Sequence, residues 1–344
     1  MDEGDAQVKP QDRRRRPRRA LTPADLAPLT RAALGPARTL TAVIRLRGGT
    51  KKGVYRLTLD DDSTAIAYVW SADEDYWDAG PSDLRDPFSH ATGYHLFAAS
   101  HARLTAAGVR TPRLLYADST HAHLPADAAI VEDLPGETLE DLLARDPHAA
   151  TEALHRLATL LDTLHACTGP RFGKVALVDN GGSSYGGSCE QRVTEGALRD
   201  VDEIARRDPR AAAAREALAD AVHTLAAEVR PRERHTLIHG ELGPDHVRLT
   251  PDGHPVLIDV EGLLYFDVEW EHAFLEIRFG PRYAALRPRT LDLDEHRMRL
   301  YRLAMHLSLV AGPLRLLDGD FPDPEPMRAI AENNLRRALE LVAP

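Results

Sequence analysis

The sequence has few cysteines and no long apolar run. Cys167 and Cys189 are its only cysteines, too few for a disulfide framework and typical of a reducing compartment. No apolar run approaches the roughly 18 residues of a membrane helix. Prolines interrupt residues 20–29, where a secretion signal would need an apolar core. The pattern therefore excludes a disulfide-stabilised module and a membrane span, and we expect a cytoplasmic protein.

Positive charge is concentrated near the N-terminus, although the net charge of the chain is −10. Residues 13–19 read RRRRPRR, which could form an arm for nucleic acid or anionic lipid, or a solvated tail. The acidity of the remaining chain disfavours nucleic acid as a partner. We therefore predict a disordered basic tail over residues 1–21 and no membrane partner.

The part of the chain that follows this tail has the pattern of a small α+β lobe. At 344 residues the chain is long enough for two lobes, each with its own core. Residues 54–59 and 64–70 read as strands of a meander that begins at the Gly48–Gly49 turn. A predicted helix at 95–108 separates them from two more strands at 111–118 and 127–134. Residues 22–133 are therefore predicted to form a β-rich N-terminal lobe.

The remaining residues, 134–344, have a mainly helical pattern. Apolar residues recur at three- and four-residue spacing, for example at Leu154, Leu157, Leu161 and Leu164. The overall fold class is therefore α+β, with a helical C-terminal lobe larger than the first. Helices are predicted at 137–146, 148–167, 192–206, 211–228, 292–317 and 326–342.

One segment, residues 237–262, carries most of the chemical signal. It reads LIHGELGPDHVRLTPDGHPVLIDVEG. Two short apolar strands flank a loop rich in His, Glu, Asp and Gly, and a tight loop followed by a hairpin return brings positions 241, 246 and 259 together. Phosphoryl transfer needs an acid that accepts the proton of the acceptor hydroxyl, and two side chains that hold Mg²⁺ against the nucleotide phosphates. The spacing is typical of the catalytic loop and metal-binding acid of protein-kinase-like folds.

The segment resembles the aminoglycoside phosphotransferase and choline kinase-like family. In that family the loop reads His-Gly-Asp-Leu, an Asn follows four residues later, and Ile-Asp ends the second strand. Glu241 stands in place of the family's catalytic Asp, and His246 in place of its Asn, as in macrolide phosphotransferases. The matching residues are His239, Gly240, Leu242 and Asp259.

The resemblance extends beyond this loop, over roughly residues 40–310. Residues 130–143 resemble the family's hinge and the helix after it, and residues 259–275 resemble its run from the metal-binding Asp into a helix. The resemblance implies a bilobal protein-kinase-like fold that binds ATP or GTP with Mg²⁺ between the lobes. It places the purine against the backbone around Val131 and Asp133.

The sequence departs from the family at the cation that contacts the nucleotide phosphates. The family carries a Lys on the third strand, paired with a Glu on the next helix. Here residues 64–70 contain no lysine, and the matching position is Tyr68 or, alternatively, Trp70. The helix near residues 95–97 has no acid either, so aromatic packing is expected to replace the ion pair. Lys51 and Lys52 are then the candidate phosphate-binding cations, unless they are exposed turn residues.

The resemblance also implies individual roles in the site. Glu241 would accept the proton of the acceptor hydroxyl. His239 would act as a catalytic base or, alternatively, as a structural histidine bonded to the backbone. Asp267 and Glu269 would bind a cationic acceptor, or instead hold the turn and cap a helix that begins near residue 268. The predicted metal ligands are His246 and Asp259, and Glu261 is a third candidate for acceptor binding.

The expected function is O-phosphorylation of a small molecule. The acceptor would be the hydroxyl of an antibiotic, a sugar or an amino alcohol, and the acidity of the C-terminal lobe favours a cationic one. The alternative is a catalytically inactive pseudokinase that binds nucleotide or a small ligand, because the extra methylene of Glu241 displaces its carboxylate by about 1.5 Å. We expect a monomer or a homodimer.

Overall fold

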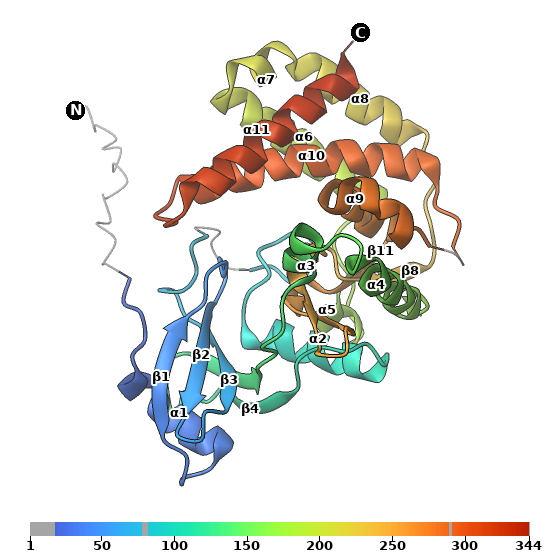
Figure 1. The fold of residues 1–344 in the computed structure, drawn as a ribbon. Coiled ribbons are helices and arrows are strands. Elements are labelled where there is room, and N and C mark those ends of the chain that lie inside the picture. Colours follow the sequence, from blue (N-terminus) through green and yellow to red (C-terminus); the bar gives the residue numbers. More distant parts are fainter. Residues whose placement is uncertain (1–17, 78–81, 289–290, 344) are drawn as a thin grey trace, which may run out of the picture.

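The computed structural model describes residues 18–77, 82–288 and 291–343, which form a two-lobed α+β fold (Figure 1). The β-rich lobe comes first in the chain and the larger helical lobe follows. The connection between them runs from residue 133 to residue 138 and contains the predicted boundary at residue 133. In this respect the fold class agrees with the prediction from sequence.

The N-terminal lobe is an antiparallel sheet covered by a helix on each face. Odd-numbered residues of β3 from 65 to 69 cluster with Leu26 and Leu29 of α1, and its even-numbered residues from 66 to 70 cluster with Phe97 and Leu104 of α2. Burial on both faces explains why β3 lacks the alternation seen in β2. The strand order within the described residues is β1-β2-β3-β5-β4. The elements are α1 (Pro23–Leu34), β1 (Leu40–Arg45), β2 (Gly53–Leu59), β3 (Thr64–Trp70), α2 (Tyr94–Ala106), β4 (Leu114–Asp118) and β5 (Asp127–Glu132).

Helix α1 is an element that the sequence pattern does not predict. Its prolines at positions 23 and 28 look like helix breakers, but Pro23 stands in the first turn, where no amide hydrogen is needed. Thr22 and Asp25 form a reciprocal capping box that satisfies the free amides of this turn. The helix closes the outer face of the sheet with Leu26 and Leu29, both fully buried.

The end of the predicted tail is in contact with the folded body. Most of the arginine run lies outside the described residues, but Arg18 is described. Its guanidinium bonds both carboxylate oxygens of Asp320 at 2.8 and 2.9 Å and lies 4.2 Å from the ring centre of Tyr76. It also donates to the backbone carbonyl of Asp73 at 2.6 Å. Residues 18–21 therefore differ from the predicted disordered tail, because ion pairing fixes them against both lobes.

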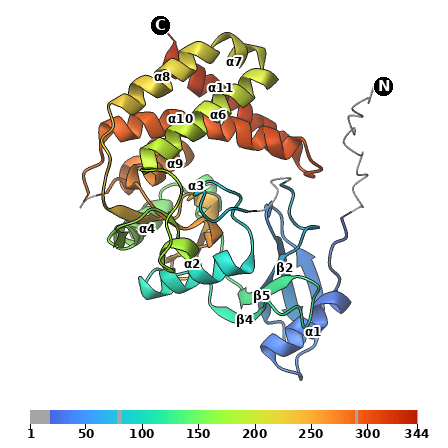
Figure 2. The same cartoon turned by 180° about the vertical axis from the view of Figure 1, so that it is seen from behind.

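The C-terminal lobe is mainly helical, with short strands near the interlobe connection (Figure 2). The predicted helices are present, but the one expected at 211–228 is broken into α7 and α8. Among the described helices, none is long and apolar enough to cross a membrane. The helices are α3 (Leu139–Arg145), α4 (Ala150–His165), α5 (Val175–Val178), α6 (Cys189–Arg207), α7 (Pro209–Ala213), α8 (Arg215–Ala227), α9 (Val268–Phe279), α10 (Glu295–Leu317) and α11 (Pro324–Val342). The strands are β6 (Thr168–Gly169), β7 (Gly173–Lys174), β8 (His235–Ile238), β9 (Val247–Leu249), β10 (Pro255–Leu257) and β11 (Leu264–Phe266), and 3₁₀ turns are η1 (Pro244–His246), η2 (Val260–Gly262) and η3 (Gly280–Leu286).

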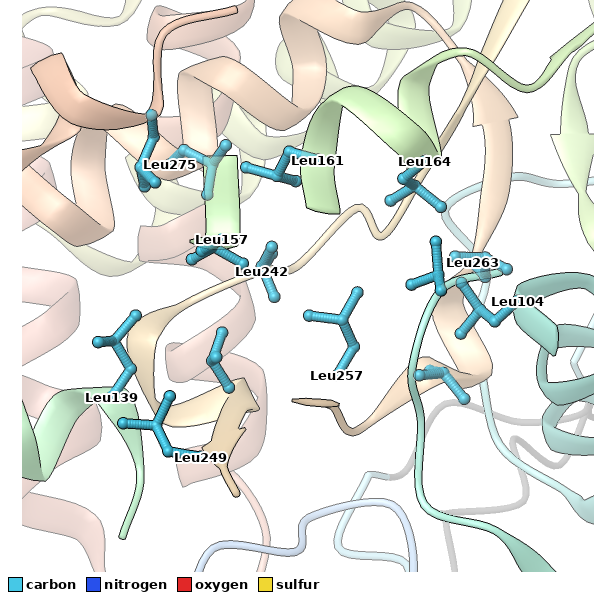
Figure 3. Close-up of a cluster of buried hydrophobic side chains, with 14 of the residues drawn as sticks. Leu104, Leu139, Leu157, Leu161, Leu164, Leu242, Leu249, Leu257, Leu263 and Leu275 are labelled. Atoms are coloured by element: carbon cyan, nitrogen blue, oxygen red, sulfur yellow. The ribbon is translucent and has the colours of Figure 1, made fainter. Parts of the chain in front are cut away.

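A leucine-rich core supports the segment around residues 237–262 (Figure 3). Leu157, Leu161 and Leu164 project from α4 at the predicted helical spacing and are buried. They belong to the same cluster as Leu242 and Leu257, which flank the predicted catalytic loop. Truncating a buried leucine to alanine typically lowers the free energy of unfolding by about 2–5 kcal/mol. The packing of these leucines therefore stabilises the position of the loop.

Candidate active site

Two strand pairings bring the predicted catalytic residues together. Strand β8 leads into the loop and pairs antiparallel with β11, while β9 and β10 form the hairpin that follows. Glu241 lies on the loop, His246 ends η1 and Asp259 follows β10. The Nε2 atom of His246 is 3.7 Å from Oδ2 of Asp259, and its Nδ1 is 2.8 Å from the carbonyl oxygen of Glu241. The three predicted positions therefore meet at one point.

The hydrogen bond of His246 determines which ring nitrogen is free. A carbonyl oxygen can only accept a hydrogen bond. The Nδ1 atom of His246 therefore carries the ring hydrogen and donates a hydrogen bond to the backbone carbonyl of Glu241. In the neutral ring this leaves the lone pair of Nε2 facing Asp259 and Asp245, each at 3.7 Å. A ligand histidine whose second nitrogen is fixed by a carbonyl is a common arrangement at metal sites. His246 is therefore oriented as a metal ligand would be.

Asp259 adopts an unusual backbone conformation at the end of the hairpin. Its φ of 59° and ψ of 49° are left-handed, which typically costs a non-glycine residue on the order of 1–3 kcal/mol. Burial opposes ionisation of this carboxyl, but the positive charges of Lys52 and Lys51 outweigh that effect and hold its pKa well below the usual range. Asp259 is therefore an anion at neutral pH.

Lys52 replaces the expected strand cation from a different place in the lobe. It comes from the turn before β2, is only 5% exposed, and is not the exposed turn residue of the alternative prediction. Its Nζ atom lies 2.5 Å from Asp259 and 2.7 Å from Oε1 of Glu261. Burial favours its neutral form, but these two carboxylates raise its pKa above the ordinary value. The charge of Lys52 is thus fixed in the cleft by two acids of the other lobe.

Aromatic side chains fill the space behind Lys52, as expected from the sequence. The Nζ atom lies 5.2 Å from the ring centre of Tyr68, on β3. Tyr68 and Trp70 each pack against Phe97 of α2 with ring centres 5.5 Å apart. The cation can be held there because the rings exclude water and the tyrosine face attracts positive charge.

Lys51, the preceding residue of the same turn, contacts Glu241. Its Nζ atom is 3.3 Å from Oε2 of Glu241, a side chain that remains 55% exposed. The charge of Lys51 lowers the pKa of the Glu241 carboxyl, which is therefore ionised at neutral pH. Glu241 is thus an accessible carboxylate at the mouth of the site.

Glu271 anchors the catalytic loop, and the sequence reasoning did not identify this role. It is fully buried on α9, and its Oε2 atom accepts the amide hydrogens of His239 and Gly240 at 2.5 and 3.0 Å. Burial raises its pKa to about 7, against the opposing effect of these amides. No local signal distinguishes it, because Glu271 shares the first turn of α9 with a second acid, Glu269.

His239 has the surroundings of a structural residue. Its ring Nε2 bonds the carbonyl oxygen of Ile258 at 2.9 Å, and the side chain is 1% exposed. Burial lowers the pKa of His239 to about 4, so the ring is neutral, and it stacks on His246 with centres 5.9 Å apart. This placement favours the alternative of a backbone-bonded histidine over a catalytic base, because the ring is not accessible to an acceptor.

The acids predicted for acceptor binding do not face an accessible surface. Glu261 is engaged by Lys52 and by the indole of Trp70 at 3.3 Å. Asp267 is fully enclosed by Arg297 and Tyr301, and Glu269 forms two 2.9 Å bonds with Arg232. The acceptor-binding prediction is therefore wrong for these residues, since burial and ion pairing leave no carboxylate for a ligand. Asp267 does precede α9, but its side chain makes no capping bond.

The predicted purine segment lies beside a cavity of about 360 Å³ between the lobes. Residues 132–134 line this cavity, whereas Val131 is fully buried and does not. Asp133 is paired with Arg56 at 2.7 Å. Arg248 donates to the carbonyls of Leu134 and Gly136 and so ties the interlobe connection to β9. Purine contacts are therefore expected one to three residues after Val131.

A second cavity of about 670 Å³ opens on the other side of the catalytic loop. Glu241 lines only this second cavity. The nucleotide-sized cleft and the larger cavity thus meet at the point where the predicted metal ligands lie. The residues that line both cavities are Gly48, Thr50, Lys51, Asp245, His246 and Asp259.

Fold and site together define a two-lobed, kinase-like phosphotransferase. The phosphotransferase enzyme family (APH) matches residues 42–301. The chain therefore belongs to this family, as the resemblance of its catalytic loop predicts. A comparison with curated proteins found no match.

Solved structures share this fold at low sequence identity. The spectinomycin phosphotransferase APH(9)-Ia, in complex with ADP and spectinomycin, is 12% identical with a TM-score of 0.63, over 95% of this chain and 96% of that one. The GDP and kanamycin complex of APH(2")-IIia is 17% identical with a TM-score of 0.59, over 91% and 96%. LicA in complex with AMP is 13% identical with a TM-score of 0.58, over 91% and 96%. At these identities the likeness shows the fold.

Proposed function

We propose that the protein transfers the γ-phosphate of ATP or GTP to a hydroxyl group of a small molecule, with Mg²⁺ as cofactor. The observation that carries this proposal is the meeting of Glu241, His246 and Asp259 where two cavities join. The smaller cavity would take the nucleotide and the larger one the acceptor. Family membership and the ADP, GDP and AMP complexes of the neighbouring structures support the same conclusion.

His246 and Asp259 are the residues that would hold Mg²⁺. Their facing atoms are 3.7 Å apart, the carboxylate is ionised, and the free lone pair of the imidazole points toward it. When bound, Mg²⁺ would neutralise charge that develops on the phosphate oxygens. Oxygen ligands suit this metal best, so the imidazole makes the site softer than one built from Asp and Asn.

Glu241 would act on the acceptor hydroxyl. Its ionised carboxylate accepts a hydrogen bond from the hydroxyl and takes the proton late in a loose transition state. Lys52 and Lys51 would contact the phosphates, since both line the smaller cavity and the amine of Lys52 bonds Asp259. The backbone of residues 132–134 would meet the purine.

An inactive nucleotide-binding protein is the second candidate, and one observation favours it. Both acids with a proposed role in transfer are engaged by lysines, Glu241 by Lys51 and Asp259 by Lys52. Catalysis requires these ion pairs to open in favour of phosphate oxygens, whereas simple binding does not. A cytoplasmic location and a monomeric or dimeric state stay predictions.

The decisive experiment compares the wild-type protein with Glu241→Gln. Acceptors are first found by a thermal-shift screen with MgATP, MgGTP and a panel of hydroxyl compounds, and phosphate transfer is then measured. We expect Glu241→Gln to lower transfer by on the order of 10²-fold or more while nucleotide affinity stays within about twofold. Asp252→Asn, on the exposed turn between β9 and β10, is the matched control and should behave as wild type. Nucleotide binding without transfer in any of the three proteins would instead establish the second candidate.

A further inference from the structure

The larger cavity has walls that are mostly apolar, and this bears on the acceptor. The inference rests on the proposed function, because it assumes that the cavity beside Glu241 holds the acceptor. The cavity extends from the catalytic loop to α6, α10 and α11 and is roofed by residues 86–91. Its aliphatic and aromatic lining includes Trp77, Phe88, Val193, Trp270, Phe274, Met305, Leu309, Leu316, Met327 and Ile330.

Charged groups in this lining are nearly balanced and largely paired. Five acidic and four basic side chains line the cavity within the described residues. Away from the catalytic junction, Asp200 is bound to Arg315 at 2.6 Å and Asp86 lies 3.3 Å from Arg192. A polycationic acceptor requires several carboxylates free to pair with its amines, because each unpaired desolvated charge is costly. The described lining does not provide them.

An aromatic pair at the rim points to the same class of ligand. Phe88 is 36% exposed, although its ring packs 4.9 Å from that of Trp270. Exposed phenylalanine beside an apolar wall is unfavourable in water and becomes favourable when a ligand covers it. Burying such surfaces against a ligand contributes roughly 25 cal/mol per Å² of apolar area.

We propose that the acceptor is a large, mostly apolar molecule that carries a hydroxyl group and at most one positive charge. A volume of 670 Å³ falls within the roughly 300–1,000 Å³ of sites for drug-sized ligands. It exceeds what a small amino alcohol fills. The apolar body would rest on α10 and α11, and its hydroxyl would reach Glu241. This differs from the cationic acceptor that net charge predicts, because the acids that line the cavity away from the catalytic junction are engaged in ion pairs.

The test measures binding and transfer separately with two kinds of probe. Erythromycin, tylosin and digoxigenin are apolar hydroxyl compounds with at most one amine, while kanamycin is a polycation and choline a small cation. Binding to the full chain is followed by calorimetry, and transfer by acceptor-dependent release of nucleoside diphosphate. At least one apolar probe should bind with a negative heat-capacity change and be phosphorylated.

A pair of variants shows whether such binding uses this cavity. Leu309→Asp and Met327→Asp place a carboxylate at half-buried lining positions, where the fold can tolerate it. Each should weaken an apolar probe by about tenfold or more and leave nucleotide affinity unchanged. Leu341→Asp is the matched control. Leu341 is on α11, the helix that carries Met327, but it is 50% exposed and lies outside the cavity.

The outcomes separate this inference from the proposed function. Transfer to kanamycin or choline alone would overturn the apolar acceptor while leaving the phosphotransferase intact. Binding of an apolar probe that the two cavity variants weaken, without transfer to any compound, would support the apolar ligand and contradict the enzyme. Absence of binding by all three apolar probes, or binding that the cavity variants leave unchanged, would overturn the inference.

Discussion

The two cavities that meet at Asp259 differ in the balance of their charges. Within the described residues, five basic and four acidic side chains line the interlobe cleft, whereas four basic and five acidic side chains line the larger cavity, together with apolar side chains of α6, α10 and α11. A triphosphate needs positive charge that stays in place, while the second cavity offers area and shape. The loop and the hairpin that follows it serve both cavities, because His246 and Asp259 line both and Glu241 lines the larger one.

Lys52→Met should produce the largest effect on the charged side. It leaves Glu261 buried with only the indole of Trp70 as partner, and breaking a buried ion pair typically costs about 3–5 kcal/mol. We expect a loss of this order in the free energy of unfolding, measured by urea denaturation, together with loss of nucleotide binding. Lys52→Met combined with Glu261→Gln should recover stability but not nucleotide affinity. If nucleotide binding also returns, Lys52 does not contact the phosphates.

Asp259→Asn tests the proposed metal ligand that lines both cavities. Asparagine tolerates the left-handed backbone of this position, so the fold should persist. Transfer should fall by on the order of 10²–10³-fold, and the dependence of nucleotide affinity on Mg²⁺, measured by calorimetry, should disappear. Undiminished transfer by this variant would contradict the assignment of Asp259 as a metal ligand.

Glu271 should make stability depend on pH beneath the loop. Its pKa is raised from 4.5 to about 7 by burial, so below pH 4.5 the folded and unfolded chains both carry the proton. Between pH 4.5 and 7 the unfolded chain releases it while the folded chain retains it, so stability falls as pH rises, by roughly 3 kcal/mol. Glu271→Gln should remove this decline relative to wild type in urea denaturation. If the free energy of unfolding changes with pH in the same way in both proteins, Glu271 is not a buried acid that stays neutral in the folded chain.

Lys51→Met should produce the smallest effect on stability. Its pair with the half-exposed Glu241 is of the kind that contributes about 0–1 kcal/mol. The contrast with Lys52→Met sharpens the comparison, since the two lysines are adjacent in sequence but differ in burial. Thermal melts of Lys51→Met and Lys52→Met compare the two losses of stability. A larger drop in melting temperature for Lys51→Met than for Lys52→Met would contradict this prediction.

Much of this molecule follows from local sequence patterns. The helical spacing of Leu157, Leu161 and Leu164 identified α4, and the strands of the N-terminal lobe follow from alternation and turn residues. The convergence of positions 241, 246 and 259 could be predicted, because it depends on one loop and one hairpin.

The features that sequence reasoning missed depend on distant partners. Lys52 and Glu261 are 209 positions apart, so no local pattern shows that they pair. Glu271 looks like an ordinary helix residue until burial and two backbone amides surround it. Asp267 and Glu269 appear available in the sequence, but Arg297 and Arg232 reach them from remote segments.

Through Arg18, the N-terminal segment contacts both lobes. It joins the residues that follow β3 to the turn between α10 and α11, and so links the two lobes. Salt screens the ion pair between Arg18 and Asp320, but it has less effect on the packing of Arg18 against the ring of Tyr76. The relative position of the lobes is therefore supported by a residue that lines neither of the two cavities.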